Sequence, residues 1–185
     1  MDKLGLTMDN KARLFALFLA IFAAAALRLL PHPPNFSPIA AMALFSGAFL
    51  PRQTLAFIAP LAALFLSDLV LGFYPEIVFV YLGVAATVLI GWVIARRKTM
   101  LRVGTAAVAG SVLFFGVTNF GVWLLSGGYP RTVEGLIACY VAAIPFFQNT
   151  LAGDLFFAAL LFGGFALAER LVPNLRQPHG ARLAA

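Results

Sequence analysis

The sequence predicts an all-α integral membrane protein, built as a single bundle of six transmembrane helices. Of its 185 residues, 62% are hydrophobic and only 11% are charged, and the mean hydropathy is +0.96. A soluble domain of this length needs a polar exterior that so few charged residues cannot supply. The apolar residues fall into six stretches, most of them near the ~20 residues that a helix needs to cross a bilayer. We therefore expect one membrane domain over residues 1–185.

The six predicted spans are joined by short polar or proline-containing connections. They cover approximately residues 12–30, 36–50, 54–73, 77–95, 103–125 and 150–171. The second is short and starts with Ser37 and Pro38, so we expect it to be tilted or to begin below the membrane surface. Residues 126–149 open with turn residues and continue through an apolar piece closed by Pro145. They predict an outer loop with a short helix, and an incomplete seventh span is the alternative.

The positions of lysine and arginine predict the orientation, because positively charged loops stay on the cytoplasmic side. With the N-terminus inside, the cytoplasmic set is Lys3, Lys11, Arg13, Arg52, Arg96, Arg97, Lys98, Arg102, Arg170, Arg176 and Arg182. Only Arg28 and Arg131 remain outside. We expect both termini in the cytoplasm, and "RRKTMLR" to contact anionic lipid rather than nucleic acid. A cleaved signal peptide in the first segment is an alternative that leaves the other spans unchanged.

With this orientation, the polar residues at membrane depth gather on the outer side. Unpaired polar groups are costly in hydrocarbon, so we expect them to face one outward-facing cavity that binds a small water-soluble ligand. The predicted substrate-binding residues are His32, Asn35, Asp68, Tyr74, Glu76, Asn119, Trp123, Asn149 and Asp154. The proline-rich stretch "LLPHPPNFSP" is predicted to form a rigid wall of this cavity, because proline fixes the backbone.

Each of these residues also has an explanation that needs no ligand. Asp68 and Asp154 can pair with Arg28 or with neighbouring groups to hold helices in register. Asn119 can form an interhelical amide bond, and Asn149 can be the N-cap of the last span. The aromatic residues of the set lie at interfacial depth, where an aromatic belt is expected.

The first predicted span carries alanines at strict four-residue spacing. Ala12, Ala16, Ala20 and Ala24 form a stripe of small residues along one helix face, and such a stripe lets another helix approach closely. The partner is either another helix of the same bundle or a separate membrane subunit.

No catalytic or metal-binding pattern is present in the sequence. There is no HExxH, no GxSxG and no phosphate-binding glycine loop with its lysine. The single cysteine, Cys139, excludes an internal disulfide and paired-cysteine zinc sites. We expect no enzymatic activity, no metal and no cofactor.

Five segments resemble a family of small, uncharacterised bacterial membrane proteins that are described as transport proteins. They are "RLLPHPPNFSPIAAMALFSGAF", "PLAALFLSDLVLGFY", "VTNFGVWL", "YPRTVEGLIACYVAAIPFF" and "NTLAGDLFFAALLFGGFALAE", which extend over residues 28–169. The resemblance implies a multi-pass protein of the bacterial cytoplasmic (inner) membrane.

That family in turn resembles the substrate-binding S components of energy-coupling-factor (ECF) transporters, including the solitary cobalamin-type ones. The resemblance implies uptake of a vitamin or related micronutrient, with the alanine stripe on an ECF coupling subunit and separate ATPases supplying energy. Some cobalamin-type members ligate cobalt through a cysteine, and whether Cys139 does so stays open. The alternative function is a non-transporting membrane scaffold or assembly protein that docks partners through its first helix.

Overall fold

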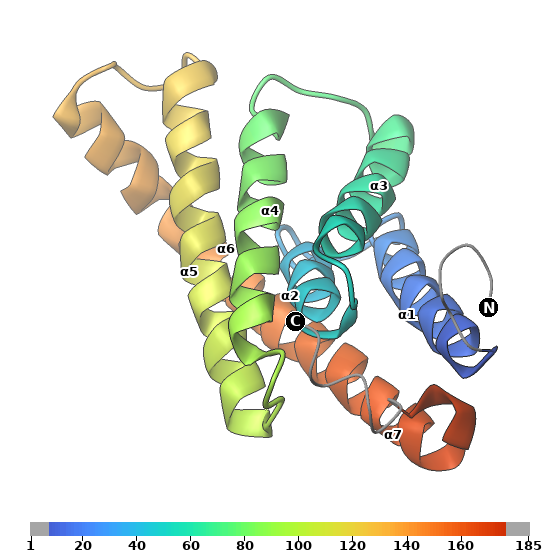
Figure 1. Cartoon of the computed structure of the whole chain (residues 1–185). Coiled ribbons are helices and arrows are strands. Elements are labelled where there is room, and N and C mark those ends of the chain that lie inside the picture. The colour runs from blue at the N-terminus through green and yellow to red at the C-terminus, as the bar shows by residue number, and fades with distance from the viewer. Residues whose placement is uncertain (1–7, 177–185) are drawn as a thin grey trace.

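The computed structural model describes residues 8–176, and this part of the chain is helical with no strand. The helices are α1 (Met8–Leu27), α2 (Ile39–Phe49), α3 (Gln53–Leu71), α4 (Ile77–Ile94), α5 (Met100–Leu125), α6 (Val133–Ala158) and α7 (Gly164–Leu171), as Figure 1 shows. One π-helical turn, Ala159–Gly163, joins α6 to α7, and a 3-10 turn, Pro173–Leu175, follows. The predicted all-α fold class is confirmed.

Within the described residues, four helices are long and apolar enough to cross a membrane. They are α3, α4, α5 and the continuous 39-residue helix Val133–Leu171. Helix α2 is apolar but only 11 residues long, which is shorter than the predicted second span 36–50. Helix α1 overlaps the predicted first span but is not one of the four. The membrane character of the fold is therefore supported by four of the six predicted spans.

The clearest difference from the sequence prediction concerns residues 126–149. We expected a loop with a short helix and a last span from residue 150, but one helix runs from Val133 to Leu171. It begins at Thr132, whose hydroxyl accepts the backbone N–H three residues on at 3.2 Å. Pro145 lies inside the helix, as membrane helices tolerate when surrounding groups compensate for the lost hydrogen bond. The N-cap explanation of Asn149 is therefore wrong, because this residue lies in the helix interior.

Helix α2 lies at the centre of the bundle, and nearly all of its residues are buried. It crosses α4 at two glycines. A Cβ atom added to Gly47 would lie 2.1 Å from the Val88 carbonyl oxygen, and one added to Gly91 would lie 2.4 Å from the Leu44 carbonyl oxygen. The two backbones therefore touch directly, as small residues allow in membrane bundles.

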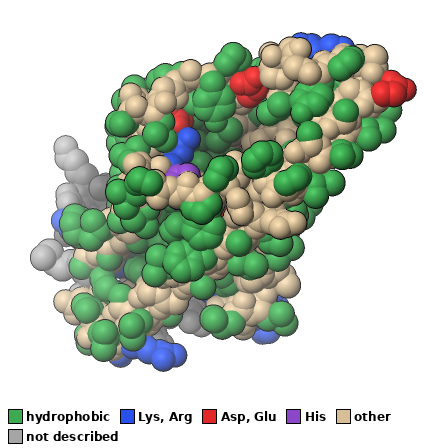
Figure 2. Space-filling model, turned by 180° about the vertical axis from the view of Figure 1, so that it is seen from behind, with side chains coloured by type: hydrophobic (Ala, Val, Ile, Leu, Met, Phe, Trp, Pro, Cys, Tyr) green, Lys and Arg blue, Asp and Glu red, His purple; other side chains and the backbone are tan. Residues whose placement is uncertain are grey.

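The two ends of the bundle differ in their connections and in charge. The end of α1, the start of α2, the α3–α4 loop and the α5–α6 loop lie at one end, which we call the cavity end (Figure 1). The α2–α3 loop, the α4–α5 loop and α7 lie at the other, the basic end. The α4–α5 loop carries Arg96, Arg97 and Lys98, and blue side chains gather at the lower edge of Figure 2.

At the basic end, Arg13 fastens α1 to the last helix. Its guanidinium donates hydrogen bonds to Glu169 and to the Leu175 carbonyl oxygen. It also lies 5.1 Å from the centre of the Phe165 ring, within the range of a cation–π contact.

The alanine stripe of α1 faces mainly inward. Ala24 is 3% exposed, and Ala16 and Ala20 are partly buried against the hydrophobic core. Only Ala12, at the basic end, is exposed. Most of the stripe therefore serves internal packing, and docking of a separate subunit stays a prediction.

Candidate functional site

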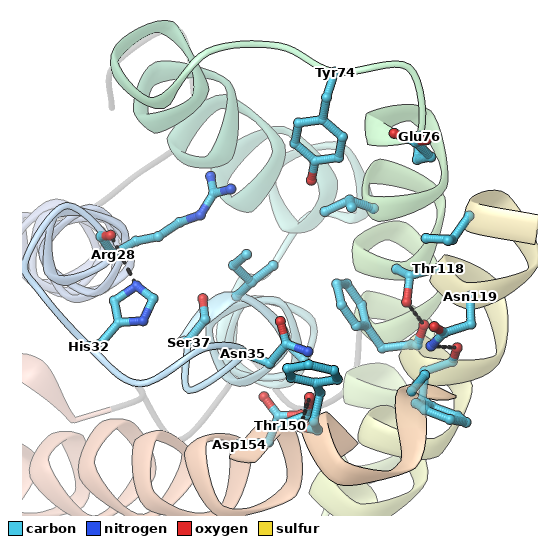
Figure 3. A pocket seen from close by; sticks show the side chains of 18 residues that line it. Arg28, His32, Asn35, Ser37, Tyr74, Glu76, Thr118, Asn119, Thr150 and Asp154 are labelled. Carbon is cyan, nitrogen blue, oxygen red and sulfur yellow. Dashed lines mark hydrogen bonds between the residues drawn. The ribbon is translucent and has the colours of Figure 1, made fainter. Parts of the chain in front are cut away.

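A cavity of about 360 Å³ lies at the cavity end of the bundle. It contains both charged and apolar side chains from α2, α4, α5, α6 and the intervening loops. Figure 2 shows it as a hollow with basic, acidic and histidine side chains at its edge, and Figure 3 shows the lining residues. Six of the nine predicted binding residues line it, namely His32, Asn35, Tyr74, Glu76, Asn119 and Asp154.

The other three predicted residues support the wall from outside the cavity lining. Asp68 lies behind the lining and binds Arg28. The Trp123 indole N–H donates to the Pro130 carbonyl oxygen at 2.9 Å, which holds the α5–α6 loop. The Asn149 amide donates to the carbonyl oxygen of Pro34.

The Asp68 side chain is fully buried, and both of its oxygens have donors. Oδ1 accepts from Arg28, and Oδ2 accepts from the Tyr81 hydroxyl at 2.9 Å. Arg28 also donates to the Ser67 hydroxyl at 2.8 Å. This network joins the end of α1 to α3 and α4, so Asp68 has the pairing role that the sequence left open. Arg28, which was not among the predicted binding residues, lines the cavity.

Tyr74 and Glu76 enter the cavity from the α3–α4 loop, and the Tyr74 hydroxyl points into it (Figure 3). Burial raises the pKa of Tyr74; Asp68 and Glu76 raise it further, whereas Arg28 opposes the shift. The phenol therefore stays protonated at neutral pH and can donate a hydrogen bond to a ligand.

The proline-rich stretch forms a turn beside the cavity. The Phe36 N–H donates to the Pro33 carbonyl oxygen at 3.0 Å, and Asn35 adopts a φ of 63°, which asparagine tolerates better than most residues. The two ring nitrogens of His32 lie 3.0 and 3.3 Å from the carbonyl oxygens of Pro33 and Arg28. The stretch is thus held largely by its own backbone.

Helix α6 fixes the far side of this stretch. The Asn149 amide donates to the Pro34 carbonyl oxygen at 3.0 Å. At Gly153 the chain comes so close that an added Cβ would lie 3.1 Å from the backbone nitrogen of Ser37. These contacts place Ser37, a cavity residue that sequence reasoning missed, against the part of α6 that carries Asp154.

Helix α5 supplies two polar side chains that each donate one hydrogen bond within the helix, which uses the single hydrogen of the Thr118 hydroxyl and one of the two hydrogens of the Asn119 amide. The Asn119 amide donates to the Phe115 carbonyl oxygen at 2.9 Å, and the Thr118 hydroxyl donates to the Phe114 carbonyl oxygen at 2.8 Å. Both therefore present acceptor oxygens for a ligand. Cys139 is buried, and its thiol lies 3.5 Å from the Asn119 backbone oxygen.

Asp154 is the second buried carboxylate among the described residues, and it is 2% exposed. Its Oδ2 accepts a hydrogen bond from the Ser111 hydroxyl at 2.6 Å. Among the described residues, no group of three or more histidine, cysteine or acidic side chains is placed to hold a metal ion. Ser111 was not identified from the sequence, because an isolated serine in an apolar run gives no signal of its own, and Ser37 lies in the predicted wall but was not among the predicted binding residues.

Comparison with known proteins places the chain in a family without assigning an activity. The model of a family of unknown function, DUF6580, matches residues 8–175. No curated protein and no solved structure matches the chain. The matched region includes the whole cavity, and the chain belongs to this family.

Proposed function

Taking its membership of DUF6580 as the starting point, we propose that the protein is a membrane transport protein that binds a small water-soluble ligand in the cavity. The observation that carries the proposal is that predicted binding residues from separate parts of the chain line the same cavity. Six predicted binding residues, from the loop after α1, the α3–α4 loop, α5 and α6, line one space of about 360 Å³. That volume is within the range of small-molecule sites, roughly 300 to 1,000 Å³.

The charge distribution supports entry of the ligand from the outer side. The arginines and lysines of the α4–α5 loop lie at the end opposite the cavity, and basic loops stay in the cytoplasm. In this orientation the cavity opens outward from a bacterial inner membrane. A cysteine at exposed Arg97 should then resist impermeant maleimide in intact cells and react after permeabilisation; labelling in intact cells would reverse the orientation.

The lining is suited to a ligand of mixed polarity, such as a vitamin or related micronutrient. Phe114, Phe115 and Phe146 provide an apolar wall, and Arg28 and Tyr74 provide polar groups. In the ECF transporters whose S components the chain resembles, a coupling subunit and ATPases supply the energy. We propose the same division of labour here.

Native mass spectrometry of gently purified protein tests the binding function. We expect a co-purified small molecule in the wild type and its loss in Ala143→Trp, because this residue lines the cavity and the indole would fill it. The matched control is Ala142→Trp, because Ala142 is exposed and does not line the cavity. No adduct in the wild type, or equal occupancy in both variants, would contradict the proposal.

The second candidate function is a scaffold that docks partners through α1, and it depends on the solvent- or lipid-exposed end of the alanine stripe. Ala12 is exposed, and Phe15 beside it is 70% exposed. Cross-linking from Ala12→Cys in native membranes should capture a second protein if this function is correct. Capture of lipid alone would leave the binding function as the single candidate.

A further inference from the structure

The hydrogen bonding of Asp154 is incomplete for a buried carboxylate. This cavity-lining side chain receives one hydrogen bond, on Oδ2 from Ser111, and Oδ1 has no donor among the described residues. The Ser111 hydroxyl also lies 3.0 Å from the Ala107 carbonyl oxygen. Because a hydroxyl has one hydrogen, even this donor is shared.

No basic side chain lining the cavity compensates Asp154. The basic lining residues are Arg28 and His32. Arg28 is engaged by Asp68, which is fully buried and negatively charged when paired. His32 is exposed, and its ring nitrogens lie beside backbone carbonyl oxygens. Glu76 adds a further negative charge to the lining, so the cavity has an excess of negative charge when its carboxyl groups are ionised.

A second unused polar atom lies in the same cavity. The Ser37 hydroxyl oxygen is buried and has no hydrogen-bond partner, and Ser37 lines the cavity with Asp154. The close approach of its backbone to Gly153 places it next to the helix turn that carries Asp154. Figure 3 shows Ser37 and Asp154 on the same side of the cavity, across from Tyr74.

These observations favour one kind of ligand group. A protonated amine carries a positive charge and several N–H donors, so it can compensate Asp154 and still has N–H groups for another acceptor of the lining, such as Ser37. A divalent metal ion prefers several oxygen ligands, and the described residues hold no such cluster. The phenyl rings of Phe114, Phe115 and Phe146 are available for an apolar part of the ligand.

We propose that the ligand is a small organic ammonium compound and that Asp154 is the counter-ion of its amine. This inference rests on the proposed binding function and narrows it to a substrate class. The alternative for Asp154 is a proton on the carboxyl group in every state of the protein. The two differ in whether the cavity selects for positive charge.

Binding of two matched probes to the full-length protein in detergent tests the inference. Benzylamine and benzyl alcohol have the same ring and differ in charge. By thermal-shift titration, we expect the wild type to bind benzylamine at least about tenfold more tightly than benzyl alcohol, which corresponds to about 1.4 kcal/mol. Asp154→Asn should abolish this preference. Glu134→Gln removes the same charge from an exposed residue outside the cavity lining and should change the preference by less than about threefold, because solvent screens it.

Ser37→Ala gives a second measurement should Asp154→Asn fail to fold. We expect it to weaken benzylamine binding by about threefold to tenfold, the effect of one lost hydrogen bond, and to weaken benzyl alcohol binding by no more than that, because the alcohol has a single O–H to donate. Equal binding of the two probes to the wild type, absence of benzylamine binding, or an unchanged preference in Asp154→Asn would each overturn the inference. If native mass spectrometry then still shows a neutral or anionic ligand that Ala143→Trp excludes, the proposed binding function stands and only the ammonium assignment fails.

Discussion

Asp68 and Asp154, the two buried carboxylates of the part of the chain that the structure describes, lie in cavity walls of very different construction. Asp68 is 0% exposed and is bound by Arg28 and Tyr81, on two other segments of the bundle. Asp154 is 2% exposed and is bound by Ser111 alone. Their burial is nearly equal, so burial does not distinguish them. Their hydrogen-bond partners distinguish them. A carboxylate whose two oxygens and charge are already paired within the protein has no acceptor left for a ligand.

The Asp68 side of the cavity is therefore a supporting wall, which holds helices together, and the Asp154 side is the proposed binding wall, which contacts the ligand. On the Asp68 side, charge is compensated within the protein and three helices are joined. On the Asp154 side, the protein leaves an acceptor and a negative charge available at a cavity. If this distinction is correct, matched substitutions on the two sides should differ in both size and sign.

The largest effect is expected from Arg28→Ala. The substitution removes the cation and leaves Asp68 buried without compensation, which typically costs about 3 to 5 kcal/mol of stability. Thermal unfolding in detergent measures it. The double variant Arg28→Ala with Asp68→Ala should recover part of the loss, and a single variant as stable as the wild type would remove the distinction between the walls.

A smaller loss is expected from Tyr81→Phe. Phenylalanine keeps the ring but removes one donor to Asp68, and hydrogen bonds to charged groups contribute about 1.5 to 3 kcal/mol. Because Arg28 still compensates the charge, the loss should fall below that of Arg28→Ala in the same unfolding assay. A loss of equal size would mean that the phenol, and not the guanidinium, supports Asp68.

On the other wall, Ser111→Ala should cost about 1.5 kcal/mol, the low end of the contribution of a hydrogen bond to a charged group. The effect is expected to be modest because the Ser111 hydroxyl is shared between Asp154 and its own helix. Unfolding of the ligand-free protein measures it. Val112→Ala, one residue on and 55% exposed, is the matched control, and a comparable loss there would show that the hydrogen bond contributes little.

The smallest effect, of opposite sign, is expected from Asp154→Asn without ligand. Asparagine keeps an acceptor for Ser111 and removes a poorly compensated buried charge, so stability should stay equal or rise by at most about 1 kcal/mol. The same exchange at Asp68 should destabilise the protein. A similar loss at both positions, measured by unfolding temperature, would show that Asp154 is structural as well.

The helical fold and the gathering of polar groups at one end could be predicted because they depend on local patterns. Runs of apolar residues predict helices, and the positions of arginine and lysine distinguish the two ends. The continuation of α6 through Pro145 was missed, because proline marks a helix end in most contexts and nothing local shows that the bundle tolerates it. Pairing with Arg28 was one of the two roles that the sequence left open for both aspartates, and the sequence could not show which of them pairs: Arg28 is 40 residues from Asp68, and Ser111 is 43 from Asp154.

The helix Val133–Leu171, which includes the π-helical turn Ala159–Gly163, connects the cavity end of the molecule to the basic end. At about 1.5 Å per residue its 39 residues extend about 58 Å, roughly twice the ~30 Å hydrocarbon core of a bilayer. Asp154 and Glu169, which binds Arg13 at the basic end, are separated by about 22 Å along its axis. A rotation of the helix by about 5° around Asp154 would move Glu169 by about 2 Å, enough to change a hydrogen bond. Ligand binding at Asp154 and the Arg13–Glu169 contact at the basic end therefore involve the same helix.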